Sequence, residues 1–213
     1  MNRSLLAIAM LCLAFQAFSD EPASEKSPIS EKDRVFDQIA GAASSIETLA
    51  SGFAQENHSA MLKDVPVSKG RFYYRSPDGL RWEVLEPNPM GFVVNGDKAK
   101  RWRGQNGRSQ SFDLRREPVV RIITDQVFAW ARADFKWLEE RYTITVVDDA
   151  PVVLKLVPVS SSEKKHVDHI RLTFSETDAH VSEVEIRETG GDYTVIRFIN
   201  TAVNSPLEED LFD

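Results

Sequence analysis

The chain has 213 residues, of which 42% are hydrophobic and 28% charged, so it is long enough and apolar enough for one domain with a substantial core. Its 33 acidic and 26 basic residues give a net charge of −7, which argues against a nucleic-acid partner because phosphate contacts need a basic surface. A single cysteine excludes an internal disulfide, and with four scattered histidines we expect neither a metal site nor another cofactor.

The N-terminal segment has the layout of a secretory signal peptide. Arg3 supplies a positive charge, residues 5–15 are apolar, and Ala17 and Ser19 are the small residues that precede a cleavage point. The apolar run is too short to cross a bilayer comfortably. We therefore expect export to a bacterial periplasm. The predicted organisation is a signal peptide over residues 1–19, a flexible lead-in over 20–29 and a single domain over 30–213.

A first helix is predicted from Ser30 onwards. Ser30 is a favourable N-cap residue and is followed by acidic residues in the first turn. Apolar residues then recur at steps of one, three and four as far as Leu49, which predicts an amphipathic helix of about five turns. After Gly52 the apolar period changes from 3.6 to 2. The helix stripe consists of Val35, Phe36, Ile39, Ala42, Ala43, Ile46 and Leu49.

Most of the remaining chain alternates between apolar and polar residues, as in residues 81–84 and 142–146. Turn signals separate these runs at intervals of about ten residues, which predicts an antiparallel meander rather than βαβ units. The turn signals are Pro77-Asp78-Gly79, Asn95-Gly96, Asn106-Gly107, residues 148–151 and Gly190-Gly191.

Residues 118–138 interrupt the alternation, because their apolar residues fit helical spacing and predict one or two short helices. The predicted fold is α+β, mainly β, with about 10–11 antiparallel strands. A sheet of this size must close, split into layers or be covered. Two amphipathic helices could bury their stripes only on an open sheet. We therefore expect an open half-barrel whose apolar concave face is covered by the N-terminal helix and the mid-chain insert and binds a hydrophobic ligand.

One block of sequence resembles a known family. Residues 70–83 read GRFYYRSPDGLRWE and are followed by Glu86-Pro87 and by VVNG at 93–96. This arrangement is similar to the hallmark block of the LolA family of periplasmic lipoprotein carriers, and residues 206–212 resemble the closing segment of that family.

The resemblance implies an open half-barrel with a helical lid. It also implies a monomer that shelters the acyl chains of a lipoprotein, or of a related lipid cargo, between an inner-membrane donor complex and an outer-membrane acceptor. The implied cavity and lid residues are Phe72, Tyr74, Leu80, Trp82, Val84, Val94, Trp102, Phe112, Val120, Ile123, Val127, Phe128, Ile144 and Val146.

The arginine that latches the lid in the family stands immediately before the proline of this block. Ser76 occupies that position here, so Arg75 and Arg81 are the latch candidates. A shift of one residue along a strand reverses the direction of the side chain, which leaves room for a family member with a different lipid cargo.

Several features allow more than one interpretation. The four tryptophans fit either the core or a cavity wall. Arg101 and Arg103 share one strand face, which is either solvated or faces an anionic partner. No nucleophile elbow or phosphate-binding glycine loop occurs, so we do not expect an enzyme. Besides a lipoprotein carrier, the sequence allows a carrier of a glycolipid or other acylated product, a lipid-sensing regulatory domain of the same fold, or a secreted hydrolase on another β scaffold.

Overall fold

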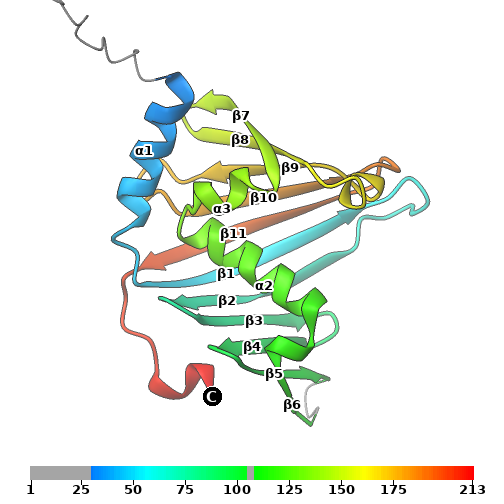
Figure 1. Cartoon of the computed structure of the whole chain (residues 1–213). Coiled ribbons are helices and arrows are strands. Elements are labelled where there is room, and N and C mark those ends of the chain that lie inside the picture. The colour runs from blue at the N-terminus through cyan, green and yellow to red at the C-terminus, as the bar shows by residue number, and fades with distance from the viewer. Residues whose placement is uncertain (1–29, 105–107) are drawn as a thin grey trace, which may run out of the picture.

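The computed structural model describes residues 30–104 and 108–213 and confirms the predicted fold class (Figure 1). One antiparallel sheet contains all eleven strands described, in the order β6-β5-β4-β3-β2-β1-β11-β10-β9-β8-β7. Strands β6 and β7 form the two edges and are not neighbours, so the sheet is an open arc rather than a closed barrel.

The strands are β1 (Thr48–His58), β2 (Val67–Arg75), β3 (Gly79–Glu86), β4 (Met90–Asn95), β5 (Lys98–Arg103), β6 (Gln110–Asp113), β7 (Tyr142–Asp149), β8 (Val152–Pro158), β9 (Val167–Phe174), β10 (Val181–Glu188) and β11 (Tyr193–Val203). The helices are α1 (Glu31–Ala43), α2 (Pro118–Ala131) and α3 (Phe135–Glu139), with short 3₁₀ turns η1 (Leu114–Arg116), η2 (Glu163–Lys165) and η3 (Glu209–Phe212). None of the helices in the described ranges is long and apolar enough to cross a membrane.

Helix α1 begins where the sequence predicted but ends earlier. The Ser30 hydroxyl accepts a hydrogen bond of 3.1 Å from the Asp33 amide, as an N-cap should. The helix ends at Ala43, and the last two residues of the predicted stripe lie outside it, with Ile46 in the link between α1 and β1 and Leu49 in β1. Both are buried in the core, so a helix and a following strand together mimicked one longer helical stripe. Strand β1 consequently starts before Gly52, where the sequence placed the change of period.

The mid-chain insert forms two helices, α2 and α3, within the predicted range. The predicted turn at Asn106-Gly107 lies outside the described residues, as do the proposed signal peptide and lead-in. Helix α3 stacks on α1 through Phe135 and Phe36, whose ring centroids are 4.0 Å apart. Helix α2 lies across the face of the sheet (Figure 1), and its Phe128 packs against Tyr74 of β2 with centroids 6.1 Å apart. We call the face that α2 covers the concave face.

The C-terminal segment packs on the opposite, convex face of the sheet. Arg81 donates a hydrogen bond of 3.0 Å to the carbonyl oxygen of Leu211, and the Arg75 guanidinium lies 4.3 Å from the ring centroid of Phe212. Phe212 is buried. The segment from Asn204 to the C-terminus therefore covers part of β3 and β4 on the convex face and does not cover the concave face.

His180 makes stability dependent on pH. It is buried between β9 and β10, and its Nδ1 has no hydrogen-bond partner among the described residues. Burial lowers the pKa of His180 from its ordinary 6.5, against the smaller opposing effect of Asp178. The unfolded chain then binds this proton more readily, so the contribution to stability is complete above about pH 6.5 and is lost as the pH falls below it.

We expect the wild type to lose more free energy of unfolding than His180→Gln between about pH 7.5 and about pH 5. Urea unfolding of both proteins at the two pH values measures this. Equal losses would mean that His180 does not couple folding to protonation.

Candidate functional site

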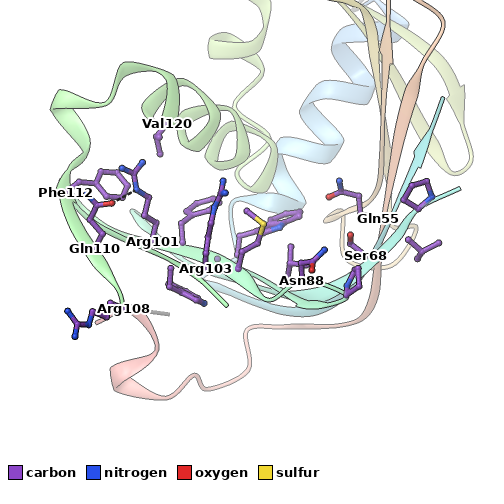
Figure 2. Close-up of a pocket in the computed structure, with 18 residues that line it drawn as sticks. Gln55, Ser68, Asn88, Arg101, Arg103, Arg108, Gln110, Phe112 and Val120 are labelled. Carbon is purple, nitrogen blue, oxygen red and sulfur yellow. Dashed lines mark hydrogen bonds between the residues drawn. The ribbon is translucent and has the colours of Figure 1, made fainter. Parts of the chain in front are cut away.

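A large cavity lies on the concave face over strands β2 to β6 and has a volume of about 940 Å³ (Figure 2). This is at the upper end of the range of about 300–1,000 Å³ that small-molecule sites occupy. Its floor is apolar and is made by side chains of neighbouring strands, and Val120 of α2 borders it from above. The apolar lining includes Trp82, Val84, Met90, Phe92 and Phe112.

Strand register explains why these side chains share one face. Cross-strand partners in an antiparallel sheet point to the same side, and alternate residues along one strand do so as well. Trp82 pairs with Phe92, and Val84 pairs with Met90, across the β3–β4 hairpin. The two pairs are two residues apart and therefore form a continuous apolar surface on the concave face.

An aromatic cluster separates this cavity from the packed core. The Trp82 ring lies 4.4 Å from Phe53, 5.8 Å from Phe72 and 6.2 Å from Phe198, measured between centroids. Gly70 makes the arrangement possible, because a Cβ at this position would lie 2.4 Å from Cζ of Phe53. The glycine that opens the family-like block thus allows Phe53 to approach the sheet backbone closely.

Helix α2 packs closely against the middle of the concave face. The space beneath it is only about 30 Å³ and is lined by Val127, Trp130 and Ala131 of α2 together with residues of the sheet. The indole Nε1 of Trp130 is buried without a hydrogen-bond partner among the described residues. An unpaired buried donor costs about 1–3 kcal/mol. The contact between α2 and the sheet is therefore weaker than a wholly apolar one, which favours its opening.

The structure brings five of the predicted cavity residues together around the large cavity: Trp82, Val84, Trp102, Phe112 and Val120. Trp102, which lines the large cavity, pairs with Gly91, and its ring centroid lies 5.0 Å from the Arg81 guanidinium. A second group faces the same concave side but is packed into the core beside or beneath α2. This group consists of Phe72, Tyr74, Leu80, Val94, Val127 and Phe128.

The remaining predicted residues lie elsewhere. Ile144 and Val146 are on β7: Ile144 is buried in the core cluster, Val146 packs against it, and both border a separate hollow next to the first turn of α1. Ile123 is on α2 but is 52% exposed, so it is not part of the buried surface of that helix.

Neither latch candidate contacts the helices in the described part of the chain through a hydrogen bond or an ion pair. Arg75 lies over Phe212, and Arg81 bonds to Leu211 and to Glu83. Both arginines hold the C-terminal segment against the convex face. Ser76 thus stands where the resemblance places the latch arginine, and the neighbouring Arg75 contacts Phe212 of the C-terminal segment instead.

Sequence reasoning missed Met90 and Phe92 of β4 and did not place Arg101 and Arg103 at the cavity. The signal was available, because Asn95-Gly96 forms the turn between β4 and β5, and the register of both strands can be counted from it. Arg101 pairs with Phe92, and Arg103 pairs with Met90. The surface formed by cross-strand pairs on the concave face therefore extends onto β5, where it includes these two arginines.

Known proteins resemble this chain in sequence and in fold. The model of the family described as outer membrane lipoprotein carrier protein LolA matches residues 44–213. An outer-membrane lipoprotein carrier protein of Pseudoalteromonas translucida (strain TAC 125) is 21% identical over 184 residues, which cover 83% of this chain and 79% of that protein.

Two solved structures share the fold. An uncharacterised conserved protein of Thermus thermophilus aligns with a TM-score of 0.53 and 10% identity, over 85% of this chain and 93% of that one. MucB, solved in the Pseudomonas aeruginosa MucA/MucB complex, aligns with a TM-score of 0.51 and 14% identity, over 86% of this chain and 61% of that one. At these identities the similarity shows the fold alone.

Proposed function

The chain belongs to the LolA family of outer membrane lipoprotein carrier proteins, and on this premise we propose that it shelters the acyl chains of a lipoprotein or related lipid during transfer from the inner to the outer membrane. LolA family proteins are periplasmic carriers rather than enzymes. We infer the same location and role for this chain from its membership of the family. The observation that supports the proposal most directly is the apolar cavity of about 940 Å³ on the concave face.

The physical need for such a cavity is large. Each methylene exposed to water costs about 0.8 kcal/mol, so a palmitoyl chain costs on the order of 10 kcal/mol. Unaided transfer between membranes is therefore slow. A soluble protein that offers Trp82, Val84 and Met90 as an alternative surface removes most of this barrier. Release requires that the same surface be opened again, and an outward movement of α2 would provide this opening.

Native mass spectrometry of protein purified without detergent tests the proposal. We expect a bound species that carries acyl chains, and an inner-membrane donor complex and an outer-membrane acceptor would load and unload it. A preparation that stays empty, and that does not bind a myristoyl or palmitoyl lipid when one is added, would contradict the carrier function.

Val84→Asp should weaken binding of an acyl lipid at least about tenfold. A carboxylate in the floor keeps water in the cavity and prevents the burial of about two methylenes, each worth about 0.8 kcal/mol. Leu85→Asp is the matched control, because the neighbouring side chain points to the other face and is already 42% exposed. Isothermal titration with a myristoyl lysolipid measures both. Similar losses in the two variants would place the acyl chain elsewhere.

A further inference from the structure

The charges around the cavity are unlike those of the protein as a whole. The chain carries a net charge of −7, yet none of the described residues that line the large cavity is acidic. Its charged residues are Arg101, Arg103 and Arg108. Within this cavity the local charges therefore favour an anionic group over a cationic one, in spite of the negative net charge of the protein.

Two of these arginines point into the cavity. Arg101 and Arg103 alternate along β5, so they share the concave face with their partners Phe92 and Met90. Figure 2 shows both side chains rising from the sheet towards α2, whereas Arg108 lies at the outer end and points away from the cavity. The cavity thus has an apolar floor on β3 and β4 and a cationic end on β5.

The guanidinium of Arg101 is held in place by neutral neighbours. It lies 5.2 Å from the ring centroid of Phe112, and its Nε donates a hydrogen bond of 3.2 Å to Oε1 of Gln110 on β6. These contacts orient the side chain and leave its charge uncompensated.

Carboxylates neutralise other arginines of the sheet but not these two. Arg81 pairs with Glu83, and Arg197 pairs with Glu56 and Glu183. Within the described ranges, no carboxylate oxygen lies within 4.0 Å of Arg101 or Arg103. Inward-pointing charges also protect the edges of sheets from association. That role would place them on β6, which is the edge strand, whereas both arginines are on β5 beside the apolar floor.

We propose that the cavity selects an amphiphile with an anionic head group: the acyl chain lies on the floor formed by Trp82, Val84 and Met90, and Arg101 and Arg103 bind the head group. The planar guanidinium donates paired hydrogen bonds to phosphate or carboxylate oxygens, which a point charge cannot do. Apolar contacts supply most of the affinity, and the two arginines supply the preference for head-group charge. This inference rests on the proposed function and names the class of its cargo.

A pair of lipids with the same chain tests the inference. Myristoyl lysophosphatidylglycerol is anionic, and myristoyl lysophosphatidylcholine is zwitterionic. We expect the full chain to bind the anionic lipid at least about tenfold more tightly, in isothermal titrations at low salt and below the concentration at which either lipid forms micelles, and we expect sodium chloride to reduce the preference. Inorganic phosphate alone should neither bind measurably nor displace the lipid, because the head group acts together with the chain.

The double variant R101Q/R103Q should lose the preference and still bind the zwitterionic lipid. Both side chains are exposed, so the fold should survive, and thermal melting checks this. K98Q/K100Q is the matched control, since it removes the same charge from the alternate positions of β5, which face the convex side, and it should keep the preference.

Each outcome separates the two proposals. Equal binding of both lipids by the wild type would overturn the inference and leave the carrier function standing. Preference retained in R101Q/R103Q, or lost equally in K98Q/K100Q, would also overturn it. If neither lipid binds, the carrier function itself fails.

Discussion

Phe128→Asp is expected to detach helix α2 from the sheet and to shorten the retention of a bound acyl lipid at least about tenfold. Phe128 is 7% exposed and packs against Tyr74, so an aspartate there would have to lose its water within an apolar contact. That desolvation costs about 3 kcal/mol or more, which corresponds to an opening of α2 that is favoured about 100-fold. Hydrogen exchange of the α2 amides measures the opening, and the dissociation rate of a fluorescent palmitoyl lipid measures retention.

Ile123→Asp provides the control on the same helix. Its side chain is 52% exposed, so a carboxylate there stays in water and should leave both measurements close to those of the wild type. Strands β8 to β10 should keep slow exchange in both variants, because their hydrogen-bonded ladders do not involve α2. If the two variants behave alike, α2 does not act as a lid over the site.

Gly70→Ala is expected to lower the free energy of unfolding by about 3 kcal/mol, at the upper end of overpacking effects, and the melting temperature by about 6–12 °C. The added Cβ would lie 1.9 Å from the Glu83 carbonyl oxygen and 2.4 Å from Cζ of Phe53. Backbone cannot move aside as a flexible side chain can, so β2 would have to shift relative to β3, and the aromatic cluster around Trp82 would be disturbed.

Gly41→Ala is the opposite case and serves as the control. Gly41 lies on the exposed side of α1, and a Cβ there meets nothing within 4 Å. Alanine is the better helix former, so this change should raise stability by about 0.5–1 kcal/mol. Thermal and urea unfolding of both variants measure the difference. A Gly70→Ala protein as stable as the wild type would mean that the Phe53 ring does not need this close approach.

The architecture could be predicted because local patterns agreed with the fold. Alternation around Trp82 and the turn signals at Asp78-Gly79 and Asn95-Gly96 correspond to hairpins of the sheet, and the apolar spacing in residues 118–138 corresponds to α2 and α3. The family-like block lies on β2, β3 and β4. These features depend on neighbours in sequence, so a single chain displays them.

The details of the site could not be predicted because they depend on register and on contacts distant in sequence. Trp102 lines the cavity as expected, but its pairing with Gly91 and its contact with Arg81 depend on the register between β4 and β5 and on β3. The position of Arg81 depends on Leu211, which is 130 residues away. Ile123 and Phe128 both fit the helical pattern of α2, but only tertiary packing decides which of them faces the sheet.

The unpaired edges β6 and β7 have a further consequence. In a closed barrel, the number of strands and their stagger fix the radius, so the interior accommodates ligands of one diameter. No hydrogen bonds join β6 to β7 here, so the curvature of the arc can change without breaking a ladder. An arc that changes its curvature would fit hydrocarbon tails of different bulk, and selectivity would then depend on the side chains at the edge of the cavity rather than on a fixed radius.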